Sequence, residues 1–189
     1  MSKPTVGVMG ASGGDLSPAE KSRLGGLAER LGAAIAKRGG VLITGATTGL
    51  PDLVSRAAMR KGGLVVGISP AANREEHANH YGLPEDGADM IIYTGFGLKG
   101  RNVVNVRSSD IVVIFGGSTG TLNEFTIAYD EGKVIGVLEG TGGIAEHIRE
   151  VLNFCQKKTP AILLFDENPD TLVDRCFEAL ESRQEEESS

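Results

Sequence analysis

Seven short, uninterrupted apolar runs alternate with helix-length amphipathic segments, and this alternation limits the folds open to the chain. The runs span residues 6–9, 41–44, 64–68, 90–93, 111–115, 134–137 and 161–165. Each is aliphatic or β-branched and is flanked by Gly, Pro, Ser or Asp, which is typical of buried strands. Uninterrupted apolarity, in place of strict alternation, is expected of a parallel sheet that helices cover on both faces.

The segments between these runs predict helices. At the first of them, Ser17 can cap the helix, Pro18 suits the first turn, and Glu20 completes a capping box. Strands that alternate with helices form βα units with right-handed crossovers. We therefore predict an α/β fold: a Rossmann-like, doubly wound, mostly parallel sheet of about seven strands with helices on both faces. The further helices are predicted over residues 51–60, 100–108, 121–131, 144–157 and 169–182, with a long loop over residues 69–89.

The length of 189 residues suits one core. We predict a single Rossmann-like nucleotide-binding domain over residues 1–182, followed by an acidic, disordered tail over residues 183–189. The net charge of −6 argues against nucleic-acid binding, which needs an excess of Lys and Arg. No apolar run is long enough to span a bilayer, and the polar N-terminus lacks a signal-peptide pattern, so a cytoplasmic protein without membrane contact is expected.

The loop after the first run, Gly10-Ala11-Ser12-Gly13-Gly14, is rich in glycine but matches no cofactor fingerprint. It lacks the G-x-G-x-x-G spacing, and the second run ends without the acidic residue that holds an NAD ribose. Gly10-x-Ser12-x-Gly14 does match the nucleophile elbow of α/β-hydrolases, yet an elbow should follow several strands. We favour a simple turn here, and keep Ser12 as an esterase nucleophile as a third hypothesis.

The loop after the fifth run is the strongest candidate for an anion site. Its glycines let backbone N–H groups point outward where a helix begins, and successive amides at a helix N-terminus bind phosphate. The loop after the second run offers further amides and hydroxyls at Gly45, Thr47, Thr48 and Gly49. The predicted ligand-binding residues of the stronger loop are Gly116, Gly117, Ser118, Thr119, Gly120 and Thr121.

Glu124, just beyond this loop, has two interpretations. Thr121-x-x-Glu124 is a capping-box pattern, which alone would account for the glutamate. A carboxylate one turn into the helix would also lie beside a bound phosphate, within reach of a ribose. The local pattern leaves both open.

Segment 75–80 contains two glutamates and two histidines. Without cysteines or another clear ligand, a solvated loop is favoured and no metal site is predicted. Tyr81, Phe96 and Phe115 are candidates to stack on a flat ring, with core packing expected for Phe115. Cys155 and Cys176 form no CxxC pair and are expected to be reduced thiols.

Gly116-Gly117-x-x-Gly120-Thr121-x-x-Glu124 resembles the P-G-G-x-G-T-x-x-E signature of the LONELY GUY (LOG) proteins. Residues 44–50 and 62–70 resemble the earlier glycine block of that superfamily. The resemblance implies a Rossmann-like fold, a homodimer or dimer of dimers, and no required cofactor. It also implies a phosphorylated small-molecule ligand, and hydrolysis of the N-glycosidic bond of nucleoside 5′-monophosphates. In that chemistry Glu124 would stabilise the oxocarbenium-like ribose or orient water, and Arg101 would fix Glu124 or the ligand.

Two positions depart from the hydrolase pattern. Phe115 replaces the signature proline, and Arg101-Asn102 replaces an Arg-Lys pair. These changes, together with Asn105, resemble the molybdenum-cofactor-carrier branch of the superfamily. The alternative function is therefore a non-catalytic carrier or sensor of molybdenum cofactor or of another phosphorylated heterocycle.

Overall fold

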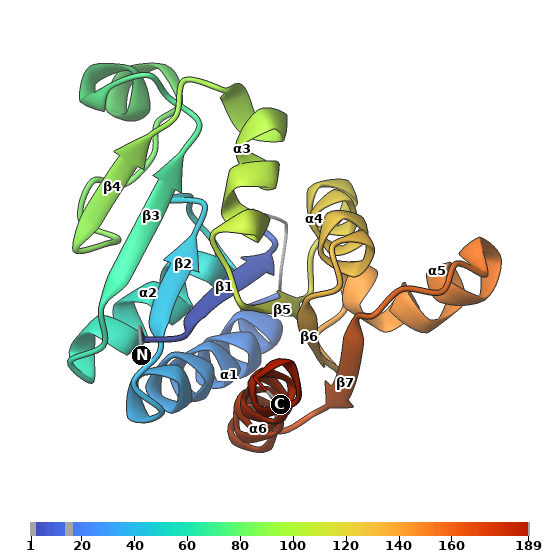
Figure 1. The fold of residues 1–189 in the computed structure, drawn as a ribbon. Helices are drawn as coiled ribbons and strands as arrows, with labels where there is room; N and C mark the ends of the chain where they lie inside the picture. The colour runs from blue at the N-terminus through green and yellow to red at the C-terminus, as the bar shows by residue number, and fades with distance from the viewer. Residues whose placement is uncertain (1–2, 14–16, 189) are drawn as a thin grey trace.

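The computed structural model describes residues 3–13 and 17–188. All seven strands form one parallel sheet in the order β4-β3-β2-β1-β5-β6-β7 (Figure 1). The predicted Rossmann-like fold is confirmed, and the sheet is entirely parallel. The strands are β1 Thr5–Gly10, β2 Val41–Thr44, β3 Val65–Ser69, β4 Met90–Tyr93, β5 Ile111–Phe115, β6 Val134–Leu138 and β7 Ile162–Asp166.

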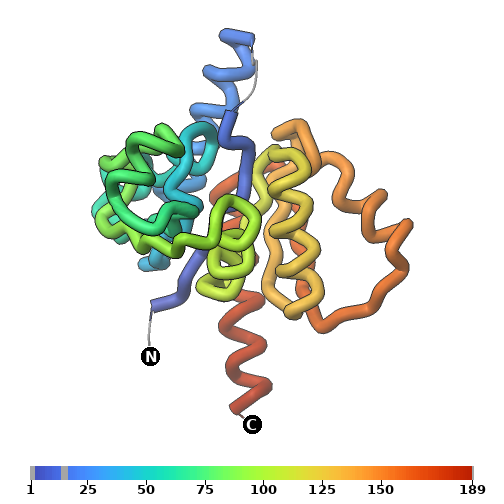
Figure 2. The backbone as a smooth tube through the Cα atoms, turned by 90° about the horizontal axis from the view of Figure 1, so that it is seen from above, coloured from blue at the N-terminus to red at the C-terminus, as the bar shows by residue number. Residues whose placement is uncertain are grey.

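Helices cover both faces of the sheet, and each face has its own hydrophobic core. Helices α1 (Pro18–Lys37), α2 (Leu50–Arg60) and α6 (Pro169–Glu187) pack on one face. On the other face lie α3 (Gly97–Arg107), α4 (Thr119–Asp130) and α5 (Ile148–Cys155), which follows the 3-10 turn η2 (Gly143–His147). Figure 2 shows α3 and α4 side by side, with the chain around α5 standing off the body.

The order of the strands reverses between β1 and β5. From β1 the chain winds outward through β2, β3 and β4, and it then returns to place β5 on the other side of β1. Gly10 pairs with Phe115, so the two strands end level with each other. In open parallel sheets this reversal leaves a crevice at the carboxyl ends of the strands, where ligands bind. The fold therefore brings the loops after residues 10 and 115 together.

Local signals explain how α1 forms. The capping box is present as predicted: Ser17 Oγ accepts a hydrogen bond from Glu20 N (3.3 Å), and Ser17 N donates to Glu20 Oε2 (3.0 Å). Gly32 lies at the crossing with α2, where an added Cβ would stand 2.8 Å from Ala58 N. The helices can approach this closely only because residue 32 has no side chain.

The structure corrects two local predictions. A π-helical turn, η1 (Glu76–His80), interrupts the expected loop, and His77 is fully buried instead of solvated. Its Nδ1 lies 2.8 Å from Ser69 Oγ and its Nε2 3.0 Å from Pro84 O, so the ring ties both ends of the segment together. The helix α4 begins at Thr119 and not at residue 121, which places Thr121 inside the helix.

At the C-terminus, α6 continues to Glu187, so residues 183–187 are helical where the composition predicts a disordered tail. Arg183 NH2 donates to Pro160 O (2.9 Å), which anchors this part of the helix to the loop before β7. None of the described helices is long and apolar enough to cross a membrane.

Candidate functional site

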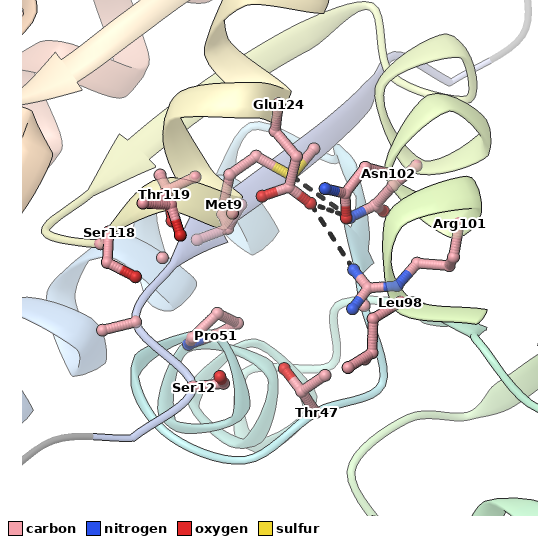
Figure 3. A pocket seen from close by; sticks show the side chains of 18 of the residues that line it. Met9, Ser12, Thr47, Pro51, Leu98, Arg101, Asn102, Ser118, Thr119 and Glu124 are labelled. Atoms are coloured by element: carbon pink, nitrogen blue, oxygen red, sulfur yellow. Dashed lines mark hydrogen bonds and ion pairs between the residues drawn. The ribbon is translucent and has the colours of Figure 1, made fainter. Parts of the chain in front are cut away.

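A cavity of about 360 Å³ opens at the strand reversal, between the ends of β1, β2 and β5 and the helices α3 and α4 (Figure 3). This volume falls in the range of small-molecule sites, about 300–1,000 Å³. Nine of the residues predicted from sequence line it. They are Gly45, Thr47, Arg101, Gly117, Ser118, Thr119, Gly120, Thr121 and Glu124.

The N-terminus of α4 forms one end of this cavity. Leu122 N donates to Ser118 O (2.9 Å) and closes the first turn, so the amides of Thr119, Gly120 and Thr121 precede the first intrahelical bond. The Ser118 side chain makes no capping hydrogen bond to them. Gly117 turns the chain into the helix with φ +93°, a conformation that favours glycine. Unfilled amides and the positive end of the helix dipole together favour an anion here.

Arg101 and Glu124 form a buried ion pair across the cavity. Arg101 NH1 lies 3.5 Å from Glu124 Oε1, and the two side chains are only 9% and 8% exposed. Gly45 lies against the guanidinium: an added Cβ would stand 2.5 Å from Arg101 Cζ. Only glycine fits at position 45, because the guanidinium of Arg101 occupies the space of a side chain. This requirement is independent of any contact between the Gly45 amide and a ligand.

Glu124 does not act as a capping residue; its carboxylate faces α3. Asn105 Nδ2 donates to Glu124 Oε1 (3.3 Å) and also lies 3.2 Å from Met9 Sδ. With the Asn102 amide turned to satisfy its neighbours, its Nδ2 donates to Leu98 O (3.0 Å) and to the same Glu124 oxygen (3.3 Å). Three side chains of α3 therefore converge on Oε1.

The second oxygen of Glu124 points away from α3 toward Thr119 (Figure 3). Burial raises the pKa of this carboxyl, and the Arg101 charge opposes the rise. Burial likewise lowers the pKa of Arg101, against the effect of Glu124. Burying the two charges therefore costs solvation free energy, which is a common feature of charged groups at functional sites.

Two buried polar atoms beside this pair have no protein partner within the described ranges 3–13 and 17–188. They are Arg101 Nε, a donor, and Asn105 Oδ1, an acceptor. Both residues line the cavity. Because unpaired buried polar atoms are rare and costly, an acceptor supplied to Arg101 Nε and a donor supplied to Asn105 Oδ1 would stabilise the site.

Sequence reasoning missed several lining residues. Residues 10–13 of the β1 loop border the cavity, although their sequence predicts a simple turn. Ser12 is among them, but no described histidine contacts it, and His147 pairs instead with Glu150. Gly14 of the elbow pattern lies outside the described residues. Lys99 and Asn105 also line the cavity. No sequence motif marks Lys99, and only the folded structure places it at the cavity wall.

Three predicted ligand residues shape the loops but are not among the described lining residues. Thr48 Oγ1 donates to Ser12 O (2.7 Å), which ties the β2 loop to the β1 loop. Gly49 has φ +83° and lies against the same β1 loop. Gly116 N donates to Thr141 Oγ1 (3.0 Å). Phe115 is fully buried in the core, and neither Tyr81 nor Phe96 lines the cavity described here.

Known proteins resemble this chain over most of its length. The sequence of an uncharacterized protein from Archaeoglobus fulgidus is 38% identical over 135 residues, a match that covers 68% of this chain and 83% of that protein. The X-ray structure of TM1055 aligns with a TM-score of 0.77 and 29% identity, covering 95% of this chain and 99% of that one.

Two further structures have names that mention molybdenum cofactor. The molybdenum cofactor binding protein from the phototrophic bacterium Rippkaea orientalis has a TM-score of 0.71 and 30% identity, with 96% and 98% of the chains covered. The molybdenum cofactor carrier protein from Chlamydomonas reinhardtii has a TM-score of 0.72 and 26% identity, with 95% and 99% covered. The resemblance drawn from the glycine motifs is thereby confirmed. Residues 3–173 match the SLOG cluster4 family, and the chain belongs to this family.

Proposed function

We propose that this protein is a carrier that binds a phosphorylated heterocycle, with molybdenum cofactor as the leading ligand. The observation that carries the proposal is the arrangement of the cavity at the strand reversal. An anion site at the N-terminus of α4 lies at one end, and the unpartnered atoms Arg101 Nε and Asn105 Oδ1 lie beside it. The similarity to molybdenum cofactor binding and carrier proteins supports the choice of ligand.

The residues present fit such a cargo. A pterin edge carries both hydrogen-bond donors and acceptors, which is what an unpaired Arg101 Nε and Asn105 Oδ1 require. A terminal phosphate matches the amides of Thr119, Gly120 and Thr121. The side chain of Asn102 stands where the hydrolase pattern has lysine, and the loop keeps Phe115 in the core instead of a proline. In this account the protein holds the ligand and shields it.

The test is retention of the ligand through purification. The protein is expressed in cells that make molybdenum cofactor, and pterin fluorescence after oxidation and molybdenum content are measured. Gly120→Leu should abolish retention, because Gly120 lines the cavity and a leucine side chain would occupy the space of the ligand. The variant should still fold, because its Cβ would meet only Lys99 Nζ, at an ordinary contact distance of 3.6 Å. Gly26→Leu, on exposed α1 surface with open space around its Cβ, is the matched control. A wild-type protein free of pterin and molybdenum would contradict the proposal.

A second candidate, hydrolysis of nucleoside 5′-monophosphates, is favoured by one specific observation. Glu124 is buried beside the anion site, yet one of its oxygens points away from Arg101 toward the cavity wall at Thr119. Such a carboxylate could stabilise positive charge on a ribose. A chromatographic screen for free base released from nucleoside monophosphates, run beside Glu124→Gln, separates the two functions. Release that is lost in the variant would establish hydrolysis; no release from any monophosphate leaves only the carrier.

A further inference from the structure

We propose that Lys99, on the first turn of α3, is the side chain that contacts the phosphate of the bound ligand and makes the cavity selective for phosphorylated compounds. The inference rests on the proposed function, because it assumes that the cavity binds a phosphorylated ligand. It adds a residue that neither the glycine motifs nor the names of the similar proteins indicate.

The position of Lys99 links two elements. The residue belongs to α3, but its ammonium reaches across to the N-terminus of α4, where it lies 3.6 Å from the point at which a Cβ of Gly120 would stand. Lys99 therefore lies next to the amides of Thr119, Gly120 and Thr121. A phosphate on those amides would lie within reach of the ammonium.

The charge balance of the cavity singles Lys99 out. Among the residues that the structure describes, the charged ones in the lining are Lys99, Arg101 and Glu124, so the described part of the wall carries a net +1 within a protein of net charge −6. Arg101 already forms an ion pair with Glu124, with 3.5 Å between Arg101 NH1 and Glu124 Oε1. Lys99 has no ion-pair partner within residues 3–13 and 17–188. Burial raises the pKa of Glu124, and the charge of Lys99 comes after Arg101 and Asn105 among the effects that lower it. Lys99 is thus the cation left for an incoming anion.

The surroundings of Lys99 explain why it is unpaired. Glu124, the one carboxylate among the described residues that line the cavity, is paired with Arg101, and the acidic side chains Glu131 and Asp130 lie at the far end of α4, where they pair with Arg107 and Lys157. An exposed lysine that ends beside helix-terminal amides gains a charge-assisted hydrogen bond only when an anion binds. Selectivity follows, since a ligand without phosphate gains neither the charge-assisted hydrogen bond from the ammonium nor the hydrogen bonds from the amides.

Binding of inorganic phosphate, measured by titration calorimetry at about pH 8 where phosphate is largely dianionic, tests the inference. Lys99→Gln should weaken binding by about tenfold, the effect typical of one charge-assisted hydrogen bond. Lys99→Arg, which keeps the charge, should bind within about threefold of wild type. Lys61→Gln, an exposed lysine outside the cavity, is the matched control and should bind as wild type does. Added salt should shrink the difference between wild type and Lys99→Gln, because exposed charges are screened.

The outcomes separate this inference from the proposed function. Equal phosphate affinity of wild type and Lys99→Gln would overturn the role of Lys99 and leave the carrier intact. Loss of binding in Lys99→Arg as severe as in Lys99→Gln would overturn it too, because charge would not be the property that matters. If the wild type neither binds phosphate nor retains pterin, both the inference and the proposed function fail.

Discussion

Arg101→Met is the substitution whose effect follows most directly from the structure. It replaces the guanidinium by an apolar chain of similar length and leaves Glu124 without its cation. Because both side chains are more than nine-tenths buried, solvent cannot replace the lost charge. Breaking a buried pair in this way costs about 3–5 kcal/mol in the free energy of unfolding. For a domain of this size the melting temperature should fall by roughly 6–20 °C.

The loss should depend on pH in a defined direction. Burial already raises the pKa of Glu124 above its ordinary value of 4.5, and removing Arg101 removes the charge that opposes the rise. A carboxyl with a raised pKa in the folded state binds its proton more tightly when folded. Its stabilising contribution is therefore complete below the unfolded pKa and is lost as the pH rises through the folded pKa. The deficit of Arg101→Met should be smallest in acid and should grow toward neutral pH.

Urea unfolding of wild type and Arg101→Met at about pH 5 and about pH 8 measures this effect. The double variant Arg101→Met/Glu124→Leu is the control, since removing both charges should restore much of the stability at the higher pH. A deficit below about 1 kcal/mol would show instead that the pair is solvated and contributes little to stability. A deficit that is equal at both pH values would contradict the expected pH dependence.

Three further predictions follow from packing. Gly32→Val should lower the free energy of unfolding by several kcal/mol, because its side chain would overlap α2. Gly26→Val, in the same helix but with open space around it, should leave the free energy of unfolding unchanged or raise it by about 0.3 kcal/mol, because valine has a higher helix propensity than glycine; urea unfolding measures both. Cys155 should react with a thiol reagent within minutes in the folded protein, while Cys176, whose pKa burial raises to about 12, should react only on unfolding. His77→Ala should make the segment between Ser69 and Pro84 sensitive to limited proteolysis, because both of its ring hydrogen bonds are lost; unchanged cleavage would contradict the anchoring role.

The parallel sheet and the helical layers on its two faces could be predicted from the local pattern of apolar and polar residues. The uninterrupted apolar runs mark every strand to within a few residues, because the central strands are buried on both faces; the edge strands β4 and β7 are apolar as well, although they are only partly buried. The alternation with helices then implies parallel pairing. The glycine-rich loop at the start of α4 was also predictable, since glycine, serine and threonine between a strand and a helix are typical of a tight junction with free backbone amides.

What the sequence could not show depends on contacts between distant segments. Glu124 fits a capping box locally, and only the packing of α3 against α4 turns it toward Arg101 and Asn105. His77 looks like a loop residue until its ring is buried between Ser69 and Pro84. An exposed lysine has no periodic signature, so the place of Lys99 beside Gly120 emerges only from the fold.

The proposed carrier function requires that this cavity bind a phosphorylated pterin through its phosphate. The most direct measurement compares the affinity of the wild-type protein for the oxidised, phosphorylated pterin derived from molybdenum cofactor with its affinity for the same compound after phosphatase treatment. We expect the phosphorylated form to bind at least about tenfold more tightly, since the dephosphorylated form makes no hydrogen bonds to the α4 amides. Equal affinity for the two forms, or no binding of either, would contradict the proposed function.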